Sequence, residues 1–325
     1  MGALTVYKMI NPYQQIQTKF AKRLLIIDGM AVVFRGYYAI PKLTTHDGKN
    51  TNAVMGFFMI IMNLMQQLKP THVVFCFDLS GGSNRKDEYE AYKANRTQAP
   101  DELYEQIAYI KEGIQTLNIP ILAKPGFEAD DLIASLVKRE EKNAEDQLNI
   151  VYTGDLDILQ LANQKTQILT PHNQKIGKLF DEQAVLEKYG FSPAQIPDYK
   201  GLHGDSSDNL PGVKGVGPKT AIKLLQTYGS LENIYNNLQD LSPKMQELFN
   251  THKDIAFLCK KLATLESDLE ITNPTSDFEI NKININDGLD YFHKFAMRRQ
   301  LIQLKQLQKQ LNIPEEKDEA QLELF

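Results

Sequence analysis

The sequence has few cysteines, no excess of positive charge and no long apolar run. Its two cysteines, Cys76 and Cys259, are too few for a disulfide framework or a zinc cluster, and they suit a reducing cytosol. The net charge of −5 excludes a general basic coat for nucleic acid, although a local basic patch stays compatible with it. No apolar run approaches the roughly 18 residues of a membrane span, and residues 1–22 lack the apolar block of a signal peptide.

An alternating pattern of strands and helices is what the sequence does contain. Of the 325 residues, 42% are hydrophobic and 24% charged, so the chain can bury a core and has room for about two domains. Short apolar runs predict buried strands at 24–27, 72–77, 119–122 and 149–153. Helices are expected at 53–68, 101–117, 129–142 and 158–163. This alternation indicates an α/β fold, with a mostly parallel sheet and flanking helices.

The pattern changes at about residue 180, where the strands give way to helices. We expect a flexible lead-in over residues 1–22, an α/β domain over 23–180, an α-helical domain over 181–312 and a tail over 313–325. The helical domain is punctuated by prolines and is expected to end in a single helix over 287–311 with a basic, glutamine-rich face. The tail begins with a polar spacer.

Nine acidic residues stand at the ends of predicted strands, at helix entries or in turns. They are Asp28, Asp78, Glu128, Asp130, Asp131, Asp155, Asp157, Asp205 and Asp208. Because the carboxyl ends of parallel strands open into one crevice, the first seven are expected to converge there. Asp205 and Asp208 are three residues apart, which would place both on one side of a helical turn, and the helical domain could bring them to the same crevice.

So many carboxylates cannot share a small volume without neutralisation. At an effective dielectric constant of about 20, two charges 4 Å apart repel by roughly 4 kcal/mol. Mg²⁺ is the expected counter-ion and Mn²⁺ the alternative, because both prefer oxygen ligands. Two such ions activate a water and stabilise the leaving oxygen in phosphodiester hydrolysis. Two other interpretations stay open: each acid is only a helix cap or turn residue, or a metal only stabilises the fold.

A glycine-rich hairpin over residues 212–221 opens a helix. Glycines let the backbone approach a ligand, and free N–H groups at the helix start attract a phosphate of any nucleic-acid sequence. The expected DNA-binding residues are Gly212, Lys214, Gly215, Gly217 and Lys219. The hairpin carbonyls are also candidates for holding K⁺. The alternative is an ordinary turn between core helices, and the motif is not a P-loop because the Gly-Lys-Ser/Thr ending is absent.

A basic and aromatic segment follows the glycine-containing loop after Asp78. Its residues Arg85, Tyr89, Tyr92, Lys93 and Arg96 recur three or four apart, so they are expected to share one helical face. Tyrosine stacks on unpaired bases, and lysine or arginine holds phosphates. The alternative is a solvated helix of mixed charge.

One further basic residue stands beside the acidic motifs. Lys200, just before the Gly204-Asp205 turn, is a further candidate for a phosphate contact.

These motifs together resemble the 5′-3′ exonuclease and flap endonuclease family, and most closely the N-terminal nuclease domain of bacterial DNA polymerase I. The resemblance runs from about residue 24 to about residue 300. The matching motifs are Ile27-Asp28-Gly29, Phe77-Asp78, Arg85 with Tyr92-Lys93 and Arg96, Glu128-Ala129-Asp130-Asp131, Gly154-Asp155-Leu156-Asp157 and Gly204-Asp205-Ser206-Ser207-Asp208-Asn209-Leu210-Pro211-Gly212-Val213. Leu156 departs from the family pattern, in which a basic residue is usual at this position.

The resemblance implies a PIN-like α/β domain, a helical arch over about 80–100 and a helix–three-turn–helix over about 195–228. It implies that Asp28, Asp78, Glu128 and Asp130 serve one metal group. Asp131, Asp155, Asp157, Asp205 and Asp208 would serve or support another. Tyr92, Lys93 and Arg96 would be catalytic residues of the arch, with Lys93 at the scissile phosphate, and Arg85 and Lys200 would bind DNA.

The implied activity is metal-dependent 5′-3′ exonuclease and 5′-flap endonuclease action on DNA, in primer removal and repair. The expected partner is DNA with 5′ ends or 5′ flaps, and a monomer in the bacterial cytosol near the nucleoid is expected, with no membrane contact. Since the sequence stops at residue 325, it resembles the free-standing form of the family. The rival interpretations are a PIN-like ribonuclease, which the glycine hairpin disfavours, and a junction-binding protein without catalysis.

The last five residues resemble the pentapeptide that binds the bacterial sliding clamp. In that interpretation Leu322, Leu324 and Phe325 fill an apolar pocket and Gln321 donates or accepts a hydrogen bond at its edge. The acidic spacer would then act as a tether. The alternative is a frayed terminus with chance apolar residues.

Overall fold

The computed structural model describes residues 20–45, 48–79, 81–96, 98–143, 145–172 and 175–314. Most of the predicted lead-in and the predicted clamp motif, Gln321, Leu322, Leu324 and Phe325, lie outside the described residues. No helix in the described ranges is both long enough and apolar enough to cross a membrane.

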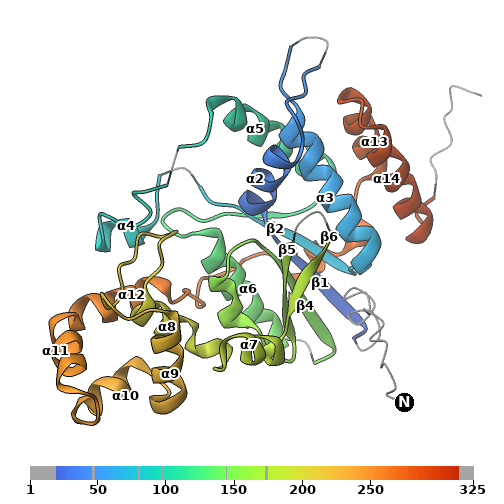
Figure 1. The fold of residues 1–325 in the computed structure, drawn as a ribbon. Coiled ribbons are helices and arrows are strands. Elements are labelled where there is room, and N and C mark those ends of the chain that lie inside the picture. The colour runs from blue at the N-terminus through green and yellow to red at the C-terminus, as the bar shows by residue number, and fades with distance from the viewer. Residues whose placement is uncertain are drawn as a thin grey trace, which may run out of the picture.

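Six strands of the described chain form one sheet in the order β3-β2-β1-β4-β5-β6 (Figure 1). β1 to β5 are parallel, and β6 is antiparallel to β5. The strands are β1 Lys22–Asp28, β2 His72–Cys76, β3 Ile121–Leu122, β4 Gln147–Tyr152, β5 Thr166–His172 and β6 Lys175–Phe180. The predicted α/β class and the four predicted strands are confirmed, with β3 shorter than expected.

The strand side chains alternate between two hydrophobic cores, one on each face of the sheet. In β1, Leu25 and Ile27 join the core beneath α2, α3 and α5, whereas Leu24 and Ile26 join the core beneath α6. Strands buried on both faces explain why the sequence shows continuous apolar runs here. The helices of this half are α2 Gly29–Ala39, α3 Asn52–Leu68, α4 Asn84–Glu88, α5 Asp101–Thr116, α6 Ala129–Asn143 and α7 Glu182–Tyr189, and the predicted helix at 158–163 is the short 3-10 helix η1 Asp157–Leu161.

A second half of short helices follows η2 Pro193–Gln195 and lies beside the carboxyl edge of the sheet (Figure 1). Its helices are α8 Ile196–His203, α9 Pro218–Tyr228, α10 Leu231–Asn236, η3 Leu238–Asp240, α11 Pro243–Thr251 and α12 Lys253–Ala263. The predicted helix–three-turn–helix corresponds to α8, the glycine hairpin and α9. Pro218 and Pro243 each stand at the first helical position, where a missing N–H costs nothing.

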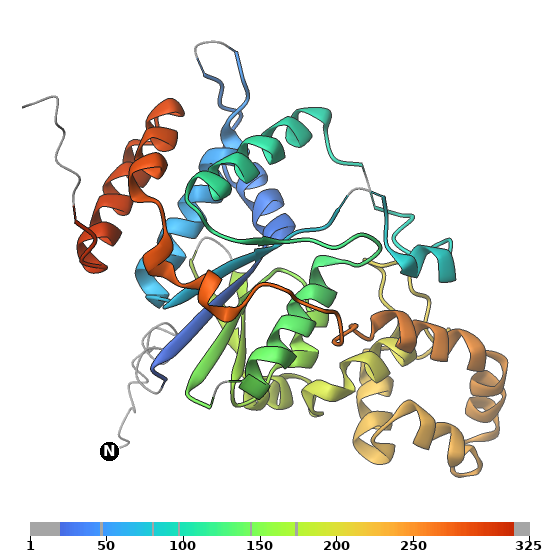
Figure 2. The ribbon, with the colours of Figure 1, turned by 180° about the vertical axis from the view of Figure 1, so that it is seen from behind.

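The chain then returns to the α/β half, which contradicts the predicted helical domain over 181–312. Figure 2 shows the segment between α12 and α13 crossing back along α6. On the way, Arg139 of α6 donates to the carbonyls of Ile271 and Asn273, and the Ile280 N–H donates to Thr71 O. The segment contains η4 Thr275–Phe278 and η5 Ile280–Lys282, and it leads into α13 Ile285–Lys294 and α14 Arg298–Gln310, which pack on α3 and α5.

The predicted single helix over 287–311 is wrong, because α13 and α14 are separate helices. Ala296 between them has a φ of 53°. Phe295 and Met297 on either side are buried in the core of the α/β half, which this turn makes possible. The break is therefore set by tertiary packing.

Candidate active site

The carboxylates at the strand ends are held by hydrogen bonds that the local sequence provides. Asp28 is the last residue of β1 and caps α2, where its Oδ1 accepts from the Ala31 N–H at 3.0 Å. Its Oδ2 accepts from the Thr153 hydroxyl at 2.8 Å. The same Thr153 oxygen accepts from the Asp155 N–H at 3.0 Å. Thr153 thus couples the ends of β1 and β4, and sequence reasoning missed it because a threonine after a strand carries no distinctive signal.

Other acids are fixed in the same way on the neighbouring turns. Asp78, after β2, accepts from the Ala129 N–H at 2.8 Å, which ties it to the start of α6. Asp155 accepts from the Asp157 N–H at 2.9 Å. The second carboxylate oxygen of Asp78 and that of Asp155 make no hydrogen bond within the described residues, so both can face a ligand.

Most of the predicted acids line one open cavity of about 1160 Å³. The acids that line it are Asp28, Asp78, Glu128, Asp130, Asp155 and Asp205. Strand ends that are distant in sequence therefore converge as the parallel sheet predicted.

The charges in this cavity repel one another. Burial raises the pKa of Asp28 to about 6, and the nearby Asp78 and Asp155 add to the effect. Burial also raises the pKa of Asp130 well above its usual range, with repulsion from Asp155 and Asp28. Buried acids of raised pKa are compensated only in part by the protein, which is the electrostatic condition that favours cation binding.

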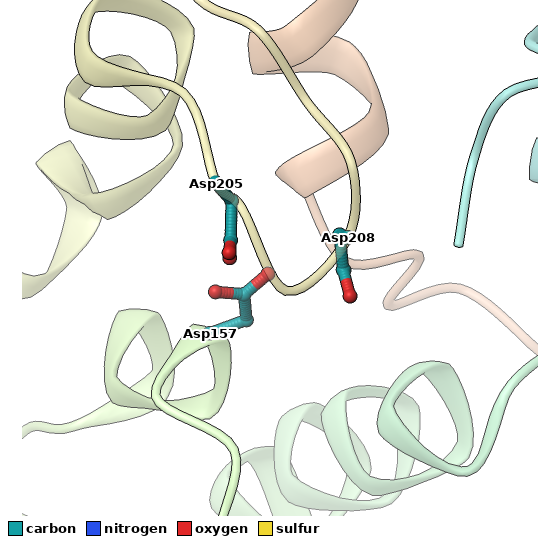
Figure 3. A group of neighbouring side chains, drawn as sticks. All are labelled: Asp157, Asp205 and Asp208. Atoms are coloured by element: carbon teal, nitrogen blue, oxygen red, sulfur yellow. The ribbon is translucent and has the colours of Figure 1, made fainter. Parts of the chain in front are cut away.

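A second group consists of Asp157, Asp205 and Asp208, whose nearest carboxylate oxygens all lie within 4.8 Å of one another (Figure 3). Asp205 and Asp208 do not lie on a helical turn as predicted. They belong to a tight loop that is closed by two backbone hydrogen bonds between Asp205 and Leu210. This loop follows α8 and turns both carboxylates toward Asp157.

Basic side chains from two segments are paired with these acids. Lys93 Nζ donates to Glu128 at 2.8 Å, and Arg96 donates to Asp208 at 2.7 Å. Lys200 pairs with both Asp157 and Asp205, and although burial acts in the opposite direction, its charge lowers the pKa of Asp205. The cavity is therefore lined by charges of both signs, and sequence reasoning did not predict that they pair with one another.

The segment from Arg85 to Arg96 is not the continuous helix that was predicted. α4 ends at Glu88, and Lys93 has a φ of 55° in the turns that follow. The side chains still converge, because Tyr92 donates its hydroxyl to Glu128 and Asp208, each at 3.2 Å. Burial is the largest cause of a strongly raised pKa of Tyr92, so this hydroxyl stays protonated and acts as a donor.

Arg85 and Asp131 form a buried pair behind the cavity lining, and Arg85 also reaches Glu128 of the lining at 3.4 Å. Two guanidinium nitrogens of Arg85 donate to the two carboxylate oxygens of Asp131 at 2.7 and 2.6 Å. Further donors of Arg85 reach the carbonyls of Leu262 and Thr264. This arrangement argues against the predicted DNA contact of Arg85. Of the two roles predicted for Asp131, serving or supporting a metal group, it favours support. The pair instead joins the start of the basic segment, α6 and the end of α12.

The glycine hairpin divides into a packed and an open part. Gly212 has a φ of 59°, and a Cβ there would lie 2.3 Å from the Gly204 backbone nitrogen, so Gly212 serves packing against α8 rather than the predicted DNA contact. Val213 and Val216 anchor the hairpin in the core. The predicted residues Lys214, Gly215, Gly217 and Lys219 are exposed, beside the N-terminus of α9.

Two family models match consecutive parts of the chain. Residues 23–190 match the N-terminal resolvase-like domain of 5′-3′ exonucleases, and residues 191–286 match their C-terminal SAM fold.

Curated relatives cover the chain to different extents. The chain is 37% identical over 292 residues to a 5′-3′ exonuclease of Aquifex aeolicus, which covers 90% of this chain and 96% of that protein. It is 42% identical over 265 residues to DNA polymerase I of Caldicellulosiruptor bescii, which covers 81% of this chain but only 31% of that protein. The chain thus spans about a third of the length of the polymerases it matches.

Solved structures share the fold at low sequence identity. The T5 5′-exonuclease with bound zinc has a TM-score of 0.63 at 18% identity, covering 88% of this chain and 99% of that one. The flap endonuclease-1 of Methanococcus jannaschii has a TM-score of 0.60 at 16% identity, covering 92% and 95%. Fold, both domain models and a relative of nearly equal length agree, and the chain belongs to the 5′-3′ exonuclease family.

Proposed function

We propose that the chain is a divalent-metal-dependent phosphodiesterase that degrades DNA from 5′ ends and cuts 5′ flaps. The observation that carries the proposal is the gathering of acids from the ends of β1, β2 and β4 around one open cavity. Family membership supports the 5′-3′ direction. The similarity to DNA polymerase I supports work in primer removal and repair.

The donor set suits hard divalent cations, with Mg²⁺ as our first choice and Mn²⁺ as the alternative. It consists of carboxylate oxygens, and burial with mutual repulsion raises the pKa of Asp28 and Asp130. Asp28, Asp78, Glu128 and Asp130 would hold one metal group, and Asp155, Asp157, Asp205 and Asp208 the other. Bound metals supply an activated water and neutralise the charge that develops on phosphate oxygens. Asp131 supports the site through Arg85.

The basic residues of the cavity position the substrate. Lys93 is paired with Glu128, and Arg96 with Asp208. Both side chains can exchange these partners for a DNA phosphate. Tyr92 holds the two acids at a fixed separation through its hydroxyl. Lys200, which is paired with Asp157 and Asp205, could exchange these partners for a phosphate in the same way as Lys93 and Arg96.

The exposed part of the glycine hairpin would bind the duplex at a distance from the reacting phosphate. Lys214, Gly215, Gly217 and Lys219 offer backbone N–H groups and positive charge without contact to base edges, so binding should not depend on sequence. K⁺ at the hairpin carbonyls remains part of this proposal.

The test is cleavage of an end-labelled DNA with a 5′ flap in Mg²⁺. Asp155→Asn keeps the oxygen that accepts from the Asp157 N–H but removes the charge, so the fold should persist and cleavage should fall by several orders of magnitude. Asp268→Asn, at an exposed acid paired with Lys138, is the matched control and should cut normally.

The rival interpretations give different results in the same assay. A ribonuclease would prefer single-stranded RNA to the DNA flap. A non-catalytic binder would hold the flap in EDTA and leave it intact in Mg²⁺.

We also propose that residues 321–325 bind the bacterial sliding clamp, on the strength of their sequence alone. Replacing Leu324 and Phe325 by alanine should abolish retention of the protein on immobilised clamp while leaving flap cleavage without clamp unchanged. Equal retention of both proteins would remove this part of the proposal.

A further inference from the structure

A row of rings in tilted contact lies along one wall of the cavity, and the proposed chemistry does not use it. The row runs from Phe191 through Tyr199 to His203, with ring centroids 5.5 and 5.4 Å apart. Tyr189 lies beside it, 6.0 Å from Tyr199. Tyr189, Tyr199 and His203 line the same cavity as the acids.

The exposure of the rings increases along the row. Phe191 is 2% exposed and belongs to the core, Tyr199 is half-buried, and His203 is exposed. A cluster that only fills the core would be covered at both ends. This row instead ends at the cavity in an accessible ring, and the His203 side chain makes no hydrogen bond within the part of the chain that the structure describes.

The accessible end is held in place by the backbone around it. His203 is the last residue of α8, and its neighbour Leu202 is fully buried. The next residue, Gly204, has a φ of 78°, donates its N–H to Lys200 O at 2.8 Å and packs against Gly212. Because the backbone that carries the ring is already fixed, binding against it loses no backbone entropy at this position.

Positive charge stands next to the rings. Lys200 directly follows Tyr199 and reaches into the acid cluster, and Lys188 Nζ lies 4.6 Å from the Tyr189 ring centroid. Flat rings beside ammonium groups match a nucleotide, because a base stacks on the ring while its phosphate pairs with the cation.

We propose that Tyr199 and His203 bind an unpaired nucleobase of the DNA strand next to the reacting phosphate. The inference rests on the proposed DNA substrate and adds a binding site for the base to it. Every base offers a stacking face, so the site would favour single-stranded character without selecting a sequence. A stacked base should tighten binding by about 5- to 100-fold.

The experiment measures whether the base and the side chains act together. The full chain is titrated in EDTA with a flapped DNA, intact or with one abasic nucleotide placed in turn at each unpaired position beside the junction. For the wild type, one position should give an abasic-to-intact ratio of dissociation constants of about 5 to 100. His203→Ala and Tyr199→Leu should reduce that ratio to about 1 while weakening binding of intact DNA.

The control is His293→Ala, at an exposed histidine on α13, which should keep the wild-type ratio. A wild-type ratio near 1 at every position, or an unchanged ratio in both cavity variants, would overturn the inference. Cleavage of the intact flap in Mg²⁺ is scored separately. If the wild type cuts DNA but its ratio of dissociation constants is near 1 at every position, only the base site is refuted. If the wild type never cuts DNA, the proposed function itself is refuted.

Discussion

Burial makes the ionised forms of Asp28 and Asp130 unfavourable in the folded state. Burial raises the pKa of Asp28 from 3.8 to about 6, so the folded chain binds this proton more tightly than the unfolded chain does. The stability of the metal-free protein should therefore fall as the pH rises from 3.8 to about 6, and the full penalty should remain above that interval. For Asp28 the interval corresponds to roughly 3 kcal/mol.

Asp130→Asn should for this reason stabilise the metal-free protein. We expect a higher unfolding temperature than wild type in EDTA at neutral pH, and a smaller further increase on adding Mg²⁺. Thermal unfolding followed by circular dichroism measures both. Asp268→Asn, at an exposed carboxylate paired with Lys138, is the control and should not raise the unfolding temperature. A variant less stable than wild type in EDTA would contradict the inference that the Asp130 carboxylate destabilises the metal-free protein.

The role predicted from sequence and the role seen in the structure differ clearly at Arg85. Because Asp131 is buried and 1% exposed, Arg85→Ala should leave an unpaired buried charge and lower the free energy of unfolding by about 3–5 kcal/mol. Urea unfolding gives this value, and Arg85→Ala combined with Asp131→Leu should recover part of it. If Arg85→Ala unfolds like wild type but binds flapped DNA more weakly, the DNA contact predicted from sequence is right and the positioning role is wrong.

At the scale of elements, the predictable parts were those whose signals are local. β1, β2 and β4 were predicted because strands buried on both faces give continuous apolar runs. The β5–β6 hairpin was not predicted, since Pro171 interrupts its first strand. The structure places this proline where the register shifts between Thr170 and His172, a position at which a missing N–H is tolerated.

α2 was also missed, because Gly29 and Gly36 weaken its helical signal. The structure explains Gly36 by contact: a Cβ there would lie 2.7 Å from the Phe57 nitrogen, where α2 crosses α3 at Gly56. The paired glycines allow two backbones to approach, a constraint that no single-helix pattern reveals. The acids at strand ends could be predicted from topology, whereas their pairing with Lys93, Arg96 and Lys200 depends on turns that bring distant segments together.

Gly36→Ala should accordingly destabilise the protein although alanine favours helices. Overpacking at the crossing should cost about 1–3 kcal/mol in urea unfolding. Gly217→Ala provides the comparison, because a Cβ at Gly217 meets nothing within 4 Å and its φ of −82° suits alanine. Equal stability of the two variants would contradict the close approach of α2 and α3.

At the scale of the whole molecule, α13 and α14 complete the core of the α/β half. Phe292 is fully buried, with its ring centroid 5.2 Å from that of Phe58 on α3. Sequence reasoning assigned these helices to the preceding domain because helical pattern alone does not show which core an apolar face covers.

Phe292→Ala should therefore lower the stability of the α/β half as a unit, by about 3–5 kcal/mol, in one cooperative transition. Ile302→Ala, at a side chain that is 59% exposed on α14, should change stability little. Circular dichroism melting of both variants checks this. A separate early transition in Phe292→Ala would show that α13 and α14 fold independently of the sheet.

Because the chain returns along α6, two backbone segments rather than one connect the helical half to the α/β half. A single linker permits hinge rotation, whereas two crossings anchored by Arg139 and by the Ile280 N–H resist it. The mouth of the cavity should consequently keep a nearly constant width, so under the proposed function a DNA end would have to thread into it instead of being gripped by domain closure.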